Sequence, residues 1–176
     1  NFYLPISKMI FKNYTKNKQT QVIGLTGGQG SGKSTISNIL KILLKELFSL
    51  ETVIFSIDDF YKTFKERKIM SKNISPLFMT RGVPGTHDER MLFRCIKALK
   101  KTKFKKILIP KFNKAIDDRV PRSKWLKVNK KPNIVIFEGW CVGVKAQKKR
   151  DLLIPINKLE KHNDKKKIWR NTVNLQ

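Results

Sequence analysis

A glycine-rich stretch near the N-terminus contains the residues best suited to chemistry. Residues 22–35 read Val-Ile-Gly-Leu-Thr-Gly-Gly-Gln-Gly-Ser-Gly-Lys-Ser-Thr. Gly27, four intervening residues, and then Gly32, Lys33 and Ser34 match the spacing of a phosphate-binding loop. Glycines let backbone N–H groups surround an anion, and the N-terminus of the following helix adds partial positive charge. The stretch therefore predicts a phosphate-binding site.

Each position of this loop has a physical task. The Lys33 ammonium would neutralise the β- and γ-phosphates of a nucleotide, and the Ser34 hydroxyl would bind Mg²⁺. We therefore expect ATP and Mg²⁺ as cofactors. The residues expected to hold them are Gly27, Gly28, Gln29, Gly30, Ser31, Gly32, Lys33, Ser34 and Thr35.

Acidic side chains follow two further apolar stretches. Residues 52–57 and 134–137 are rich in β-branched and aromatic residues, which is typical of buried parallel strands. The first leads into Asp58 and Asp59, and the second leads into Glu138. Because ligands of open α/β sheets bind where the carboxyl ends of the strands converge, we expect these acids to face the phosphate loop.

Phosphoryl transfer suggests a role for each of these groups. The reaction needs Mg²⁺, positive charge and a group that orients or deprotonates the acceptor hydroxyl. Asp58 is the best candidate for the general base, while Glu138 could hold Mg²⁺ through water or help to place the acceptor. We thus predict catalytic roles for Asp58, Lys33 and Glu138, and metal binding by Ser34 and Glu138. The alternative for each acid is a solvated carboxylate at a strand end.

The remaining sequence predicts the elements that position these residues. Residues 1–20 are compatible with a short amphipathic helix opened by Pro5, and apolar residues after the loop recur at helical spacing as far as residues 48–50. Prolines and glycines in residues 62–87 predict an irregular excursion with about one helical turn. We further expect a helix from Asp88, a short strand or edge at 107–110, a second excursion at 111–127, a loop at 142–150 and a helical turn at 157–162.

Length and composition predict one domain. The chain has 176 residues, of which 40% are hydrophobic, and this is enough for a core. We expect a three-layer α/β fold with a mostly parallel central sheet, in which residues 1–20 form a helical N-terminal segment and residues 21–176 form the core. The chain starts at Asn1 rather than at a methionine and stops at Gln176 within an expected helix, so we expect a fragment that is incomplete at the C-terminus.

The formal net charge of +26 leaves a second class of function open. Such a charge is compatible with a basic P-loop ATPase that works on nucleic acid. However, the excess consists of 31 lysines and 8 arginines spread along the chain, without a basic stripe interleaved with aromatic residues. We therefore interpret the charge as compositional bias and regard a nucleic-acid partner as the less favoured alternative.

The cysteines and the apolar stretches indicate the cellular compartment in which the protein is expected. Cys95 and Cys141 are too few and too far apart for a disulfide framework or a metal knuckle, which favours reduced cysteines. No run of residues approaches the roughly 20 apolar positions that span a bilayer, and residues 1–20 lack the apolar segment of a signal peptide. We expect a cytoplasmic protein without a membrane partner, while the oligomeric state stays open.

Several motifs together resemble a known family. They are Gly-Gly-Gln-Gly-Ser-Gly-Lys-Ser-Thr, Ser-Ile-Asp-Asp-Phe-Tyr at 56–61, Arg-Gly-Val-Pro-Gly-Thr-His-Asp at 81–88, Pro-Lys-Phe at 110–112, Asp-Arg at 118–119 and Phe-Glu-Gly-Trp at 137–140. This set is similar to D-glycerate 3-kinases of the plant and yeast type, within the group of phosphoribulokinase, uridine kinase and pantothenate kinase. The resemblance covers most of residues 20–176 in order.

The resemblance implies a P-loop kinase domain that transfers the ATP γ-phosphate to a hydroxyl of D-glycerate and gives 3-phosphoglycerate. It makes Asp58 the counterpart of the general base and Glu138 that of the strand-end acid. The acceptor region that it implies contains Asp59, Tyr61, Arg81, His87, Asp88, Lys111 and Arg119. A carboxylate substrate gives Arg81, Lys111 or Arg119 a reason to be cationic, although each could be an ordinary surface cation.

Two alternatives stay open beside this interpretation. The acceptor could be that of another kinase of the group, such as a nucleoside, a pantothenate-like acid or a sugar phosphate. His87 and Asp88 could form only a helix cap, in which Asp88 accepts hydrogen bonds from the backbone. The resemblance also implies a further helix, a lid region and a last strand near the adenine, and these lie outside this sequence.

Overall fold

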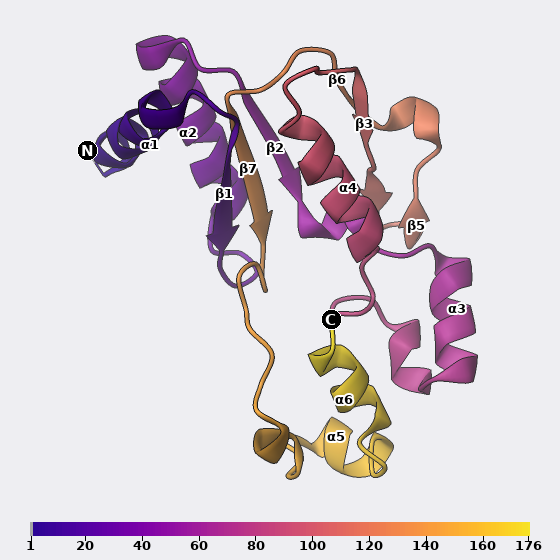
Figure 1. Cartoon of the computed structure of the whole chain (residues 1–176). Coiled ribbons are helices and arrows are strands. Elements are labelled where there is room, and N and C mark those ends of the chain that lie inside the picture. Colours follow the sequence, from indigo (N-terminus) through magenta and orange to yellow (C-terminus); the bar gives the residue numbers. More distant parts are fainter. Residues whose placement is uncertain (1) are drawn as a thin grey trace.

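The computed structural model describes residues 2–176 and has a parallel sheet at its centre (Figure 1). The strands β1 (Gln21–Thr26), β7 (Ile134–Gly139) and β2 (Thr52–Ser56) are arranged in the order β1-β7-β2. Both neighbours pair with β7 in parallel register, so that all three carboxyl ends lie at one edge. Every residue of β7 is buried, as expected for a continuous apolar run in a central strand.

One face of the sheet is covered by two helices, α1 (Tyr3–Asn17) and α2 (Lys33–Phe48). Ile134 and Ile136 of β7 point to this face because side chains alternate along a strand. The buried cluster also contains Ile10, Leu40, Leu44 and Leu50. The amphipathic N-terminal helix is thus confirmed, although it begins at Tyr3, before Pro5.

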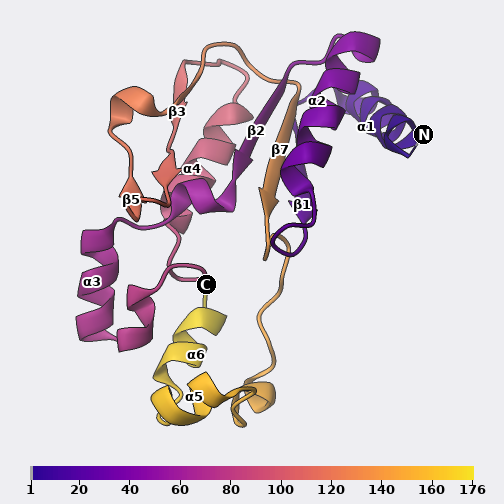
Figure 2. The ribbon, with the colours of Figure 1, turned by 180° about the vertical axis from the view of Figure 1, so that it is seen from behind.

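The other face is covered by α4 (Glu89–Leu99). Val135 and Phe137 of β7 point to this side, where they join Leu92, Cys95 and Leu99 of α4 in a second buried cluster. Beyond α4, the strands β3 (Ile107–Ile109) and β6 (Leu126–Val128) form a separate antiparallel pair. Seen from behind, α1 and α2 lie on one side of the three parallel strands and α4 lies on the other (Figure 2). The α/β fold with a parallel central sheet is therefore confirmed.

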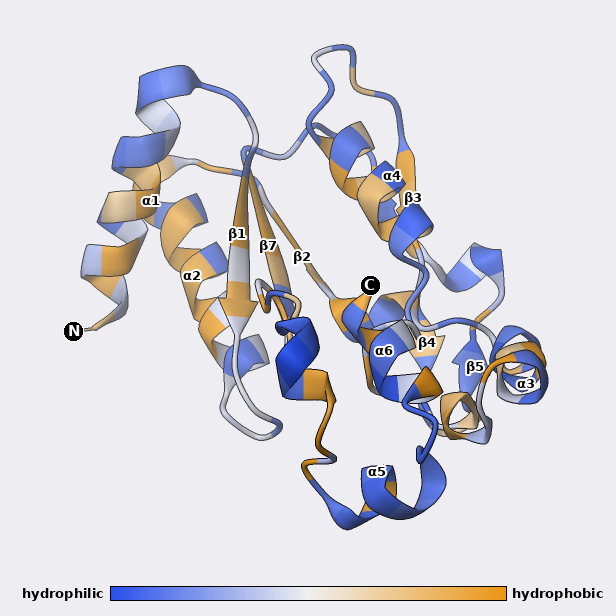
Figure 3. Ribbon diagram, turned by 60° about the horizontal axis from the view of Figure 1, so that its bottom comes forward, coloured by the Kyte–Doolittle hydropathy of each residue, from blue (hydrophilic) through white to orange (hydrophobic). Residues whose placement is uncertain are grey.

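Hydropathy follows this layering (Figure 3). The central strands are hydrophobic, and the two helices of the first layer carry hydrophobic residues where they face each other and the sheet. The helices α5 (Lys158–Asn163) and α6 (Ile168–Asn174), which lie below the carboxyl edge of the sheet in Figure 1, are mainly hydrophilic. In residues 2–176, no helix combines the length and the apolar composition that crossing a membrane requires.

The prediction for residues 62–87 is wrong. This segment contains a ten-residue helix, α3 (Phe64–Asn73), followed by the 3₁₀ helix η2 (Pro76–Met79). The Thr63 hydroxyl accepts a hydrogen bond from the Glu66 N–H, and the Glu66 carboxylate accepts one from the Thr63 N–H. This reciprocal cap fixes the start of a helix that lacks an apolar stripe, and helical spacing therefore gave no signal.

The second excursion contains a small hairpin near the sheet edge. The strands β4 (Phe112–Asn113) and β5 (Asp118–Arg119) pair in antiparallel orientation. Asn113 accepts the Ala115 N–H in the turn, and Asp117 adopts a positive φ of 53°. The other short elements are the 3₁₀ helices η1 (Ile57–Phe60), η3 (Arg122–Lys124) and η4 (Lys149–Leu152).

Candidate active site

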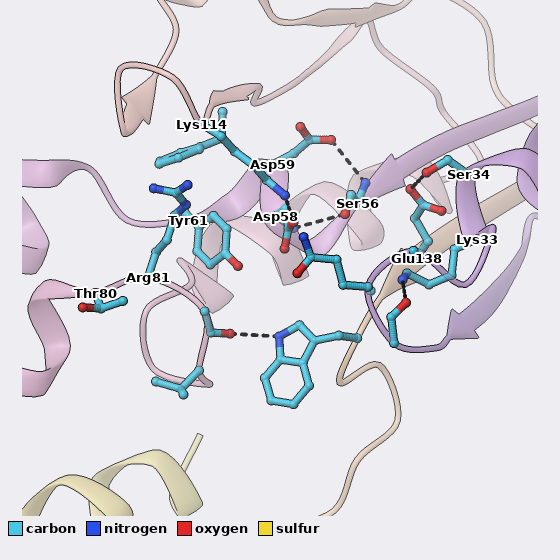
Figure 4. Close-up of a pocket in the computed structure, with 18 of the residues that line it drawn as sticks. Lys33, Ser34, Ser56, Asp58, Asp59, Tyr61, Thr80, Arg81, Lys114 and Glu138 are labelled. Carbon is cyan, nitrogen blue, oxygen red and sulfur yellow. Dashed lines mark hydrogen bonds and ion pairs between the residues drawn. The ribbon is translucent and has the colours of Figure 1, made fainter. Parts of the chain in front are cut away.

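A cavity of about 1090 Å³ opens at the carboxyl edge of the parallel sheet. The ends of β1, β2 and β7, the β4–β5 hairpin and the loop after η2 all contribute to its wall, and Figure 4 shows many of these side chains. The lining residues are Gly28, Gln29, Gly30, Lys33, Ser34, Ser56, Asp58, Asp59, Tyr61, Leu77, Thr80, Arg81, Gly82, Val83, Lys111, Phe112, Lys114, Glu138, Gly139, Trp140, Leu159 and Trp169. The structure thus brings the predicted loop and all three predicted acids to one cavity.

The glycine-rich loop wraps around the N-terminus of α2. Gly30 and Gly32 have φ values of 77° and 80°, which residues with a Cβ rarely adopt. The first hydrogen bond of the helix runs from the Ile36 N–H to the Gly32 carbonyl, so the preceding N–H groups of the first turn have no partner within the helix. Five of the nine predicted residues line the cavity, while Gly27, Ser31, Gly32 and Thr35 are not part of its lining.

Lys33 crosses this loop. Its Nζ donates hydrogen bonds to the carbonyl oxygens of Gly27 and Gly28 at 2.8 and 2.7 Å. A Cβ added to Gly27 would lie 2.7 Å from the Ser31 Oγ, so the Ser31 hydroxyl would have to move to admit a larger residue. The ammonium is therefore held next to the backbone N–H groups that would surround a triphosphate.

Ser34 and Glu138 meet across the sheet edge. The Ser34 Oγ donates to the Glu138 Oε1 at 2.9 Å, and Ser37 contacts the other carboxylate oxygen at 3.5 Å. Glu138 points toward α2 because it shares the face of β7 that carries Ile134 and Ile136. A hydroxyl and a carboxylate are ligands that Mg²⁺ accepts when water and phosphate oxygens complete the octahedron. This donor pair fits the expected ion.

Asp58 and Asp59 lie on η1, the 3₁₀ helix that follows β2. Asp59 points back to cap its own turn by accepting the Ser56 N–H at 3.2 Å, and it pairs with Lys111 at 3.0 Å. Asp58 instead extends into the cavity and pairs with the Lys114 Nζ at 2.7 Å. Figure 4 shows Asp58 and Asp59 on the side of the cavity opposite Lys33, Ser34 and Glu138.

Tyr61 and Arg81 form the wall beyond Asp58. Burial, and then the neighbouring Asp58 carboxylate, raise the pKa of Tyr61, so its hydroxyl stays protonated at neutral pH. Arg81 forms an ion pair with Asp117, which also pairs with the buried Arg67 at 2.8 Å. Burial alone would raise the pKa of Asp117, but hydrogen bonds from the two arginines outweigh it and lower that pKa. The Asp117 carboxylate thus holds the Arg81 side chain in place at the cavity.

His87, Asp88 and Arg119 lie behind Tyr61 rather than in the cavity lining. The His87 ring is 1% exposed and stacks on the Tyr61 ring at a centroid distance of 4.4 Å. Burial lowers the pKa of His87 to about 4, so the imidazole is neutral at pH 7. Arg119 donates to the Tyr61 carbonyl and to Asp88, which caps α4 through the Met91 N–H. These three residues therefore contact the wall that carries Tyr61.

The sequence interpretation did not include several lining residues among its candidates. Trp140 donates its indole N–H to the Gly82 carbonyl at 2.9 Å, which connects the end of β7 to the loop after η2. Its position directly after Glu138 and Gly139, at the end of a buried strand, could have predicted that it lies near the site. Lys114 had no such signal, because it is one lysine among many in an irregular segment. Leu159 and Trp169 come from α5 and α6, far along the chain.

Comparison with known proteins agrees with this geometry. Residues 22–174 match the model of the phosphoribulokinase / uridine kinase family. The chain is 38% identical over 146 residues to an uncharacterized kinase, mug58, of Schizosaccharomyces pombe, and the match covers 78% of this chain and 52% of that protein. It is 33% identical over 132 residues to the chloroplastic D-glycerate 3-kinase of Arabidopsis thaliana, with coverage of 70% and 29%. The chain thus spans about half of the first relative and less than a third of the second.

A solved structure shares the fold. The D-glycerate 3-kinase from Cryptococcus neoformans superimposes with a TM-score of 0.75 at 24% identity, over 86% of this chain and 56% of that chain. At this identity the likeness supports the fold alone. The family match, by contrast, includes the phosphate loop, η1, the hairpin and the end of β7. The chain therefore belongs to the phosphoribulokinase / uridine kinase family of P-loop kinases.

Proposed function

We propose that this chain is the phosphate-binding part of an ATP- and Mg²⁺-dependent kinase that phosphorylates D-glycerate to 3-phosphoglycerate. The observation that carries the proposal is the Ser34–Glu138 hydrogen bond of 2.9 Å beside the phosphate loop, in the same cavity as Asp58. A metal-ligand pair, a phosphate cradle and an acid on the opposite wall are the parts that phosphoryl transfer requires.

The residues of the loop side would hold and orient the nucleotide. Bound Mg·ATP would supply the transferable phosphoryl group and part of the charge neutralisation. Lys33 would leave the carbonyls of Gly27 and Gly28 to contact the phosphate oxygens, and Ser34 would ligate the metal. Glu138 would ligate the metal directly or fix the metal-bound water, and its contact with Ser34 already orients the hydroxyl. These groups lower the barrier by positioning and by electrostatics.

Asp58 would act on the acceptor. Its carboxylate is 28% exposed and faces the cavity from the wall opposite the loop. An acceptor hydroxyl between the two walls could therefore transfer its proton to Asp58 while its oxygen attacks phosphorus. Asp59, which caps its own turn and pairs with Lys111, would hold η1 in place and thereby direct Asp58.

D-glycerate is the acceptor that the combined observations favour. The acceptor wall carries three cations, Arg81, Lys111 and Lys114, which suit a carboxylate substrate. The relatives include a named D-glycerate 3-kinase at 33% identity. His87, Asp88 and Arg119 would then support Tyr61 and the acceptor wall from behind.

A coupled ADP-release assay on the full-length protein tests this proposal. D-glycerate, uridine, pantothenate and ribulose 5-phosphate are offered in turn, with Lys33→Ala as a control for contaminating kinases. We expect ADP release above background with D-glycerate alone. Turnover of one of the other acceptors but not of D-glycerate would assign a different substrate within the family, and ADP release stimulated only by DNA or RNA would overturn the kinase proposal.

A further inference from the structure

The cations around the cavity have different partners. Lys33 contacts loop carbonyls, Lys111 pairs with Asp59, and Arg81 pairs with Asp117. Lys33 belongs to the phosphate loop. Asp59, the partner of Lys111, also accepts a backbone N–H, and Asp117, the partner of Arg81, also pairs with the buried Arg67. Lys114, in contrast, pairs with Asp58, the acid proposed to deprotonate the acceptor.

The hairpin that carries Lys114 is firmly anchored. Arg67, which is 1% exposed, donates to the Asp117 carbonyl and pairs with the Asp117 carboxylate, both at 2.8 Å. The pairing of β4 with β5 and the hydrogen bond from the Ala115 N–H to the Asn113 side chain stabilise the rest of the hairpin. The Lys114 side chain itself is 60% exposed, so its four-carbon stem is free to move while its backbone stays fixed. The Lys114 ammonium can therefore move, although the hairpin backbone that carries it is held in place.

The pairing with Asp58 has a consequence for catalysis. An ammonium group 2.7 Å from one carboxylate oxygen competes with the acceptor hydroxyl for the base. A second anion close to Asp58 would draw Lys114 away and leave the carboxylate oxygen accessible. In glycerate, one carbon atom separates the carboxylate from the carbon that bears the reacting hydroxyl. When that hydroxyl lies at Asp58, the substrate carboxylate would lie within reach of Lys114.

From this geometry we propose that Lys114 is the specificity-determining residue of the acceptor site. It binds the carboxylate of short hydroxy acids and releases Asp58 when it does so. This inference rests on the proposed function and deepens it. A long acid such as pantothenate, whose carboxylate is distant from its reacting hydroxyl, cannot occupy both groups at once. The site therefore selects acids in which the two functional groups are close.

The test combines a charge change on the protein with a charge change on the substrate. Initial rates of the full-length protein and of Lys114→Met are measured with D-glycerate and with glycerol, which lacks the carboxylate. We expect the substitution to raise the KM for D-glycerate by about tenfold to a hundredfold, the range of a charge-assisted hydrogen bond. The KM for ATP should stay within about twofold of its original value. The weak turnover of glycerol should rise, because the substitution removes the ammonium that pairs with Asp58.

Two further variants complete the design. Lys114→Arg keeps the positive charge and should restore most of the affinity for D-glycerate, whereas Lys103→Met, an exposed lysine on the turn after α4, should change nothing. An unchanged KM for D-glycerate in Lys114→Met, or equal losses with D-glycerate and glycerol, would overturn the assignment of Lys114 alone. Failure of the unsubstituted protein to phosphorylate D-glycerate would overturn the proposed function as well.

Discussion

The two walls of the cavity are built in different ways. The loop wall consists of β1, α2 and β7, which belong to one parallel sheet and one helix layer. The acceptor wall consists of η1, the segment after α3 and the β4–β5 hairpin, which join through ion pairs such as Arg81–Asp117 and Lys111–Asp59. The first wall is fixed by regular secondary structure, and the second is fixed by side chains that lie far apart in the sequence.

This difference matches the functions proposed for the two walls, which are binding of the triphosphate and binding of the acceptor. Every kinase of this fold must hold the same triphosphate, and a local motif on a regular scaffold can do so. An acceptor site must differ between enzymes, and irregular segments joined by side chains can change without disturbing the sheet. Substitutions on the loop wall should therefore affect the use of ATP, while substitutions on the acceptor wall should affect the acceptor.

The largest effect is expected on the loop wall from Lys33→Ala. The substitution removes the cation next to the β- and γ-phosphates, so kcat/KM should fall by about three orders of magnitude while the fold survives. Steady-state kinetics of the full-length protein and circular dichroism measure the two parts. Lys41→Ala, an exposed lysine on the same helix, is the matched control. Turnover of Lys33→Ala close to that of the control would contradict the phosphate-loop assignment.

Asp58→Asn should separate the two walls most clearly. The amide keeps the shape of the side chain but cannot accept the proton, so kcat should fall by about a hundredfold, the usual scale of general-base catalysis. ATP binding, measured by isothermal titration with Mg²⁺, should stay nearly unchanged, and substitution of the exposed Asp151 on η4 (Asp151→Asn) is the control. Weaker Mg·ATP binding that excess Mg²⁺ restores would instead make Asp58 a metal ligand, and full-rate turnover would transfer the base to Asp59 or Glu138.

Arg67→Ala should weaken the acceptor wall from within. The buried guanidinium donates to the carbonyls of Lys62, Met79 and Asp117, and the substitution leaves these groups without their donor. We expect about 3 kcal/mol of lost stability, measured by urea unfolding, and a higher KM for the acceptor with an unchanged KM for ATP. Arg94→Ala on the exposed side of α4 should change neither quantity. An equal rise in both KM values would show that the walls do not act separately.

The effect that is smallest at neutral pH is that of His87, because it appears only as the pH falls. Its pKa is about 4 in the folded protein, against 6.5 for the free side chain, because burial disfavours the charged form. Between these values the unfolded chain binds the proton more readily, so stability should fall as the pH drops from 6.5 toward 4, by at most about 1.4 kcal/mol per pH unit. Urea unfolding of the protein and of His87→Gln across this range measures the difference. The same slope in both proteins would contradict the prediction, and the exposed His162→Gln serves as the control.

The sequence could predict the loop wall and only part of the acceptor wall. Gly27, Lys33 and Ser34 form a local motif, and Glu138 follows a buried strand whose end must lie at the sheet edge. By contrast, the direction of Asp58 depends on a 3₁₀ turn capped by Ser56 and Asp59, which strand periodicity does not show. The role of Lys114 depends on a hairpin anchored by Arg67, which is 50 residues from Asp117 in the sequence.

We propose that the two walls act together to move a phosphoryl group onto D-glycerate. Phosphorus-31 NMR of the full-length protein with Mg·ATP and D-glycerate tests it most directly, because the spectrum identifies the phosphorylated oxygen. We expect a phosphate monoester on the C3 oxygen, formed at the rate at which ADP appears. A monoester on C2, or free phosphate in place of any monoester, would contradict it.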